Sequence, residues 1–449
     1  MDSDTHAELG FLTIAEASRL IERKQLSPVE LTSALIRRSE LLDPQIDAYL
    51  LPTAERALDQ ARQAEREITA GAYRGAMHGI PFGLKDIYAT AGIRTTGHSR
   101  ICMDTVPSSD ATTVTKLYNA GAVLMGKLAT HEFAHGGPSF DLPWPPARNP
   151  WNREHFTGGS SSGSAAAVAA GAVPAALGTQ TVGSVNRPAA YCGVAAFKPS
   201  TQSTCTHGIT ALAPVFDTVG FYGTKVSDAV ALYDAVAPAF MSSFDRVSGS
   251  RYKIVRLEDA TLESCDGEIL KRVGDAARSI AGSGHAVRAA ASPEDLAMMF
   301  ERQLRVVHYE ASRIYRALLD PPEDRVGPKF REMIGKGLAL SETTYRGDRT
   351  RLAAARATFW AAFPETDAIL FPATPQTAPA GLASTGDPRY IGPWTALGGP
   401  IVTQPIGHHA NGLPIGMLIC GRPGSDRALA RIACALDALV SSRLMVSAR

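Results

Sequence analysis

Two glycine-rich turns, each carrying serine, lie close together near the middle of the chain. The first, residues 158–164, reads GGSSSGS and leads directly into the alanine-rich run 165–170, which favours a helix. Its hydroxyl groups would therefore stand at a helix N-terminus, where free N–H groups stabilise negative charge. The second turn, residues 178–184, ends in Ser184 and is followed by Pro188, which suits the first turn of a helix. Composition alone does not separate these turns from a glycine-serine loop that only caps helices.

The same stretch resembles the signature of the amidase signature family of serine hydrolases, and the resemblance runs, with gaps, from about residue 11 to about residue 435. Three positions match the family's Ser-cisSer-Lys catalytic set: Lys85 in GIPFGLKD, Ser160 in GGSS and Ser184 in TVGS. The separations, 160 − 85 = 75 and 184 − 160 = 24, also fit the family pattern. Without the resemblance, Lys85 would be read as a surface lysine with a solvated head.

The resemblance implies a division of roles among these residues. Ser184 attacks the carbonyl carbon, Ser160 passes the proton, and neutral Lys85 accepts it and later returns it to the leaving amine. The family places Ser160 after a cis peptide bond, and Gly159 before it eases the crowding. The expected oxyanion hole consists of the backbone N–H groups of Thr181, Val182, Gly183 and Ser184. The expected supporting or substrate-contacting positions are Ser161, Gly136 and Arg187.

The nucleophile turn departs from the usual family pattern, GTDxGGSIRxP. Gln180 replaces the aspartate, Val182 a glycine and Asn186 the arginine, while Arg187 takes an apolar place. We interpret Gln180 and Asn186 as a matched neutral pair that stands in for an Asp–Arg pair. Val182 adds a side chain beside the oxyanion hole, and Arg187 is expected to face the pocket. None of these changes removes a catalytic atom, but they put the usual substrates in doubt.

Residues 131–135 spell HEFAH, which matches the zinc motif HExxH. On a helix, this spacing would put two imidazoles on one face, with a glutamate ready as general base. However, residues 136–138, Gly-Gly-Pro, would end a helix at once. Because the family often has E-F-A-x-G at this place, the spelling is explained without metal, and we expect neither a metal nor a cofactor.

Composition excludes several classes of function. The 449 residues include 45 basic and 44 acidic side chains, a formal charge of +1, so the chain lacks the basic footprint of a nucleic-acid-binding protein. The acidic start has no apolar signal region, and no apolar stretch is long enough to span a bilayer. Six scattered cysteines without a C-x-x-C pair are typical of free thiols. We expect a cytoplasmic protein without membrane contact, with a homodimer as one possible assembly.

The pattern of elements predicts an α/β fold with a mixed, mostly parallel central sheet covered by helices on both faces. No linker divides the chain, so we expect one domain over residues 1–449. It comprises N-terminal helices (1–74), the catalytic signature core (75–236), a variable helical region near the site mouth (237–345) and C-terminal strands with a helix (346–449). In the variable region, we predict a strand at 252–257 and helices at 267–281, around 294–318 and at 324–339.

The leading function hypothesis is a serine amidohydrolase that cleaves the C–N bond of small neutral amides. An apolar surround suits aryl amides and carbamates (urethanes), with esterase as a side activity, and this resembles the aryl-acylamidase and urethane-cleaving members of the family. One alternative is the glutaminase (A-type) subunit of a tRNA-dependent amidotransferase, which carries the same three residues but works with partner subunits. Another is a catalytically silent scaffold that keeps the fold.

Overall fold

A single sheet of eleven strands runs through the described part of the computed structural model, which comprises residues 9–138, 142–237, 251–320 and 326–440. The strand order is β1-β3-β2-β4-β6-β5-β10-β11-β9-β7-β8. The strands are β1 (Tyr49–Pro52), β2 (Pro81–Lys85), β3 (Val123–Leu128), β4 (Ala175–Gln180), β5 (Ala195–Lys198), β6 (Thr218–Gly223), β7 (Lys253–Glu258), β8 (Ala286–Ala291), β9 (Ala368–Pro372), β10 (Ile401–His408) and β11 (Pro414–Cys420).

The predicted mixed α/β fold is confirmed, but the expectation of a mostly parallel sheet is wrong. Among the described residues, four strand pairings are parallel and six are antiparallel. The central strands β4, β6, β5, β10, β11 and β9 pair antiparallel with one another. Continuous hydrophobic runs are typical of parallel strands, but here the antiparallel strands β4, β6, β10 and β11 are also buried along nearly their whole length, so their sequences resemble those of parallel strands.

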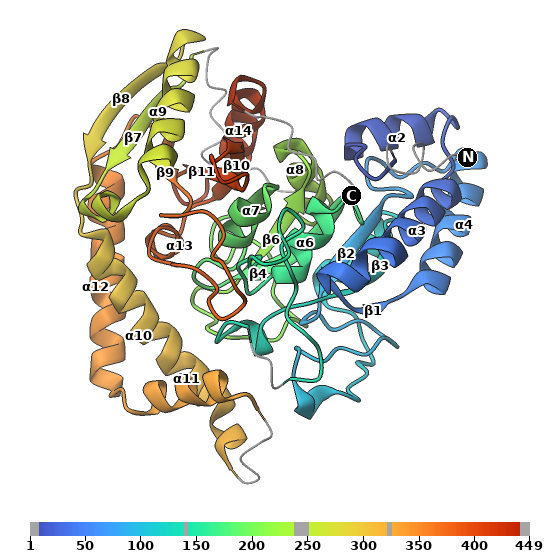
Figure 1. Ribbon diagram of the computed structural model, residues 1–449, viewed down its shortest axis with the longest axis horizontal. Helices are drawn as coiled ribbons and strands as arrows, with labels where there is room; N and C mark the ends of the chain where they lie inside the picture. The colour runs from blue at the N-terminus through green and yellow to red at the C-terminus, as the bar shows by residue number, and fades with distance from the viewer. Residues whose placement is uncertain (1–8, 139–141, 238–250, 321–325, 441–449) are drawn as a thin grey trace.

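Helices pack along this sheet and against one another (Figure 1). They are α2 (Ile14–Glu22), α3 (Pro28–Ile46), α4 (Ala54–Thr69), α5 (Thr112–Asn119), α6 (Ser162–Ala169), α7 (Asn186–Cys192), α8 (Val226–Val236), α9 (Gly267–Gly282), α10 (Leu296–Tyr315), α11 (Pro328–Leu338), α12 (Glu342–Ala361), α13 (Gly392–Ala396) and α14 (Asp426–Val440). None of the described helices combines the length and apolar character needed to cross a membrane.

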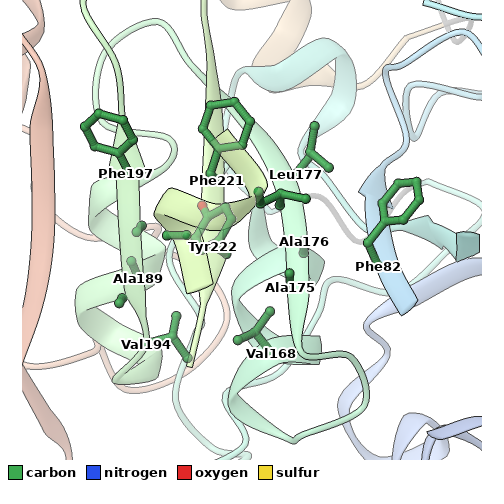
Figure 2. Packing of buried hydrophobic residues seen from close by; sticks show 14 of the residues in the cluster. Phe82, Val168, Ala175, Ala176, Leu177, Ala189, Val194, Phe197, Phe221 and Tyr222 are labelled. Carbon is green, nitrogen blue, oxygen red and sulfur yellow. The ribbon is translucent and has the colours of Figure 1, made fainter. Parts of the chain in front are cut away.

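The strands that carry the candidate site lie next to one another in a tightly packed core. Figure 2 shows Leu177 of β4 near Phe82 of β2 on one side and Phe221 of β6 on the other. All three side chains are fully buried. Burying an aliphatic or aromatic side chain of this size stabilises the fold by about 1.5–3 kcal/mol. This core therefore holds the ends of β2 and β4 in fixed positions, and both ends lead to candidate site residues.

The region between residues 251 and 361 matches the predictions in part. The strand β7 and helices α9 and α10 lie where they were expected, and α11 covers the described part of the helix predicted at 324–339. Strand β8 was not predicted, because its sequence AVRAAA is poor in the β-branched and aromatic residues that favour strands. Helix α10 packs against α11, α12 and α13 at one end of the molecule (Figure 1).

Candidate active site

Lys85 is the last residue of β2, and its side chain is fully buried. Strands β2 and β4 run parallel, with Leu84 beside Leu177, so their carboxyl ends meet at the same edge of the sheet. There the Lys85 ammonium nitrogen donates to Ser160 Oγ at 2.8 Å and to Thr179 Oγ1 at 2.8 Å. The structure thus brings together two of the three predicted catalytic residues, and the surface-lysine interpretation is wrong.

The acidic neighbour of Lys85 does not neutralise it, as the alternation of side chains along a strand predicts. Asp86 instead accepts a hydrogen bond from the N–H of Thr96 at 2.8 Å, and it lies 3.2 Å from the ammonium group of Lys127. Burial lowers the pKa of Lys85 to about 7, and the negative charge of Asp217 opposes this shift. The neutral form of Lys85 is therefore accessible at neutral pH.

Ser160 follows a cis peptide bond from Gly159, as the resemblance implied. A Cβ atom at Gly159 would lie 2.2 Å from Nε2 of His131, so only glycine fits there. The carbonyl oxygen of Ser160 accepts a hydrogen bond from the N–H of His131 at 3.1 Å. Ser160 is consequently held both through its backbone and, by Lys85, through its hydroxyl group.

Ser161 joins the two serine-bearing turns. Its N–H donates to the carbonyl oxygen of Ser184 at 3.3 Å. Its hydroxyl group donates to the carbonyl oxygen of Thr179 and accepts from the N–H of Thr179, both at 3.2 Å. Ser161 therefore aligns the Ser160 turn with the end of β4 and with the Ser184 turn.

The turn between β4 and α7 is ordered by the carboxamide of Gln180. The Gln180 oxygen accepts hydrogen bonds from the N–H groups of Val185 at 2.8 Å and Asn186 at 3.0 Å. The Gln180 amide nitrogen donates to Asn186 Oδ1 at 2.8 Å and to Thr395 Oγ1 at 2.9 Å. The predicted neutral pair of Gln180 and Asn186 is thus confirmed. The Gln180–Asn186 pair satisfies buried polar groups by hydrogen bonds between neutral side chains. A buried Asp–Arg pair would have to remove two charges from water.

The peptide groups of this turn leave their donors unoccupied. The N–H groups of Thr181, Val182, Gly183 and Ser184 donate to no acceptor within the described part of the chain. In contrast, the carbonyl oxygens of Thr181 and Val182 are bonded, by Gln303 at 3.1 Å and Thr395 at 2.6 Å respectively. With its carbonyl oxygens held, the turn can direct several N–H groups at one anion, which is the geometry that an oxyanion hole requires.

Arg187 was expected to face the pocket, but its terminal nitrogens are bonded to backbone carbonyl oxygens. The residue is 5% exposed, and its two terminal nitrogens donate to the carbonyl oxygens of Gly159 at 2.8 Å and Gly386 at 3.0 Å. The Gly159 carbonyl belongs to the cis peptide bond that precedes Ser160. Arg187 thus links this peptide to the segment between β9 and α13. Gly136, with φ +86°, lies against Lys329 of α11.

The HEFAH segment does not form the helix that a zinc motif needs. Residues Glu132–Ala134 form a single 3-10 turn (η2), with positive φ angles at Phe133 (44°) and Ala134 (67°). The carboxylate of Glu132 accepts hydrogen bonds from Ser99 Oγ at 2.5 Å and from the N–H of Gly327 at 2.8 Å. Within residues 9–138, 142–237, 251–320 and 326–440, no three His, Cys, Asp or Glu side chains are grouped so as to hold a metal ion.

The structure thus shows Lys85 in contact with Ser160, and the cis peptide bond that precedes Ser160. The family described as Amidase matches residues 30–430, which is most of the chain. The chain belongs to the amidase family. As a member of this family, it is a hydrolase that acts on carbon–nitrogen bonds.

Curated relatives in the amidase family align over almost their full length. The A subunit of glutamyl-tRNA(Gln) amidotransferase from Geobacter metallireducens is 35% identical, and the alignment covers 96% of this chain and 97% of the relative. The protein of the same name from Moorella thermoacetica is 32% identical, with 96% and 97% covered.

Solved structures of amidases show the same fold. One crystal structure of an amidase superposes with a TM-score of 0.87 at 29% identity, covering 96% of this chain and all of that one (100%). The peptide amidase of Stenotrophomonas maltophilia superposes with a TM-score of 0.80 at 26% identity, covering 95% and 96%.

Four residues around this amidase site were missed as site residues in the sequence. Their side chains contact the lysine or the nucleophile turn, and they are Thr179, Asp217, Gln303 and Thr395. Asp217 opens the stretch DTVG, residues 217–220, which is similar to the family pattern and so offered a signal for it. Gln303 lies 122 residues from the backbone oxygen that it contacts, and no local pattern could reveal that contact.

Proposed function

We propose that this protein is a serine amidohydrolase that forms an acyl-enzyme on Ser184. The observation that carries the proposal is the 2.8 Å hydrogen bond between the fully buried Lys85 and Ser160 Oγ, next to a turn whose N–H groups are free to bind an oxyanion. Burial with a pKa near 7 gives the lysine the property of a general base at neutral pH.

In the proposed mechanism, Ser184 Oγ attacks the amide carbon while its proton passes to Ser160 Oγ and the Ser160 proton passes to Lys85 Nζ. The carbonyl oxygen becomes an oxyanion, which the N–H groups of the 181–184 turn bind. Each such donor is worth about 3–4 kcal/mol in other hydrolases. The proton then returns through Ser160 to the leaving amine, the C–N bond breaks, and water hydrolyses the acyl-enzyme along the same relay.

The substrate is the part of the proposal on which the two candidate functions differ. Val182 is partly exposed and packs with an apolar cluster that includes Tyr390, Ile391 and Trp394, and this favours a neutral acyl or amine group. The curated relatives, however, favour the alternative, a glutaminase (A-type) subunit that acts with partner subunits, because they align from end to end. No comparison supports aryl amides or carbamates in particular, so a primary carboxamide such as that of glutamine ranks first.

A substrate screen tests the proposal. Purified protein is assayed with glutamine, asparagine, simple primary amides, anilides, carbamates and esters, and the Ser184→Ala protein serves as blank. Ser184-dependent release of ammonia from glutamine, increased by the other subunits of the amidotransferase, would support the glutaminase hypothesis. Release of aniline without any partner would support the aryl-amide hypothesis. If no compound is hydrolysed and no fluorophosphonate or sulfonyl fluoride probe labels Ser184, the protein is a silent scaffold and the proposal is wrong.

Arg187→Ala is expected to lower kcat about tenfold or more for every hydrolysed amide, with KM little changed. The reason is that the guanidinium donates to the peptide carbonyl that precedes Ser160. Without this hydrogen bond, Ser160 would be positioned less precisely for proton transfer. The measurement is kcat and KM for one neutral and one acidic amide.

A matched control for Arg187 is Arg38→Ala. Arg38 is also buried and donates to a backbone carbonyl, that of Ala170, at 2.8 Å. This variant should lose stability but keep kcat. A rise in KM confined to acidic amides in Arg187→Ala would contradict the prediction and make Arg187 a carboxylate anchor.

A further inference from the structure

Thr181, the first residue of the 181–184 turn, is held by hydrogen bonds of both its hydroxyl group and its carbonyl oxygen. Its hydroxyl group donates to Asp217 Oδ1 at 2.6 Å, and its carbonyl oxygen accepts from Gln303 Nε2 at 3.1 Å. Both contacts fix the peptide plane between Thr181 and Val182, whose N–H belongs to the turn that is open to an oxyanion. A rigid donor costs no reorganisation when charge develops on the substrate, so such anchoring has catalytic value.

The pairing of β4 with β6 determines the position of Asp217. Strands β4 and β6 pair antiparallel, with Gln180 opposite Thr218, so the next step of the register puts Asp217 opposite Thr181. The second carboxylate oxygen of Asp217 accepts from the N–H groups of Leu212 at 2.8 Å and Ala213 at 3.1 Å. These backbone donors fix the carboxylate and stabilise its charged form, although burial raises the pKa of Asp217 overall.

The same carboxylate is the charge that acts on Lys85. Asp217 raises the pKa of Lys85 against the larger lowering by burial, and Lys85 in turn lowers that of Asp217. His131 also faces the lysine, but burial holds its pKa far below the usual value, so it is neutral near pH 7. On the other side of the strand, Asp86 and Lys127 compensate each other at 3.2 Å.

We propose that Asp217 is a positioning residue of the hydrolytic reaction, which fixes Thr181 in the oxyanion turn and stabilises the Lys85 ammonium formed when the proton leaves Ser184. This inference rests on the proposed function. The proton that Lys85 gains is the one that Ser160 releases, and no further reactant is needed. Two features that develop charge in the transition state, the oxyanion and the ammonium group, are then coupled through one buried carboxylate.

The test is Asp217→Asn, which keeps the shape and an acceptor oxygen but removes the charge. The pH dependence of kcat/KM is measured on an amide that the wild-type protein hydrolyses. We expect the maximal rate to fall about tenfold or more and the rising limb to move from about pH 7 to lower pH, because the pKa of Lys85 falls when the nearby negative charge is lost. A variant that merely loosens the site would expose Lys85 to water and move the limb to higher pH.

Asp228→Asn is the matched control. Asp228 is likewise buried and accepts from two backbone N–H groups, those of Ile14 at 2.8 Å and Lys225 at 3.0 Å, but it lies at the start of α8. This variant should change the melting temperature and leave the pH limb in place. Thr181→Val is a second variant, in case Asp217→Asn does not fold. It keeps the carboxylate charge, so we expect a lower rate with no shift of the limb to lower pH.

The outcomes separate the two proposals. If the wild-type protein hydrolyses an amide through Ser184, but Asp217→Asn leaves the limb in place or moves it upward, the inference about Asp217 is wrong and the proposed function stands. An undiminished rate in Thr181→Val would also overturn the anchoring part. If wild-type Ser184 neither turns over amides nor reacts with a fluorophosphonate, the proposed function fails and the inference fails with it.

Discussion

Ser184→Ala is expected to lower kcat for amide hydrolysis by about 10⁴-fold or more, and to leave substrate binding nearly unchanged. In serine hydrolases, loss of the nucleophile removes the covalent route and leaves only the contribution of the oxyanion hole and of binding. The N–H groups of the 181–184 turn would remain in place here, because none of the hydrogen bonds of Gln180 that order the turn involves the side chain of Ser184. The measurement is single-turnover kinetics together with covalent labelling by a fluorophosphonate.

Ser164→Ala is the matched control for this experiment. Ser164 lies in α6, is buried, and donates to the carbonyl oxygen of Leu177 at 2.8 Å. Its loss should cost about 1 kcal/mol of stability, the net value of one hydrogen bond, without affecting labelling. Wild-type rates in Ser184→Ala, or labelling of another serine in the wild-type protein, would assign the nucleophile elsewhere.

Part of the site was predictable because it depends on residues that are close in sequence, or on a position where only one residue type fits. Gly159 must be glycine since His131 fills the space of a Cβ atom, and the pairing of Gln180 with Asn186 spans only six residues. Asp217 and Gln303 contact the same turn from 36 and 122 residues away. Such contacts depend on strand order and helix packing, which the sequence pattern does not specify.

In the fold, too, local elements were predictable from the sequence and their arrangement was not. The strands β9, β10 and β11 and the helix α14 carry clear hydrophobic patterns, and they lie within residues 346–449, where C-terminal strands and a helix were predicted. Strand direction was not predicted correctly, because the six antiparallel pairings follow from the connections between strands. For Arg187, the sequence shows that a cation is present near the nucleophile, but only the structure shows that backbone carbonyls occupy its terminal nitrogens.

Lys85→Ala is expected to lower amide hydrolysis by about 10³-fold or more, within the range that general acid–base groups contribute. A lysine with an ordinary pKa would be neutral in only about one molecule in 3,000 at pH 7, whereas burial lowers the pKa of Lys85 to about 7. In the wild-type protein, kcat/KM should therefore rise with pH through about 7, as the neutral fraction of Lys85 grows. This limb should disappear in Lys85→Ala.

Comparing an amide with an activated ester separates the two roles of Lys85. An activated ester expels a group that needs no proton, so it loses only the base that activates Ser184, while an amide also loses the acid that protonates the amine. We expect the amide-to-ester rate ratio to fall at least about tenfold. Lys198→Ala is the control, since Lys198 is also buried with a pKa of about 7 but lies on β5 and donates to Pro199 O, and its ratio should stay unchanged. An equal loss on both substrates in Lys85→Ala would remove the acid role from Lys85 and require another proton donor for the leaving amine.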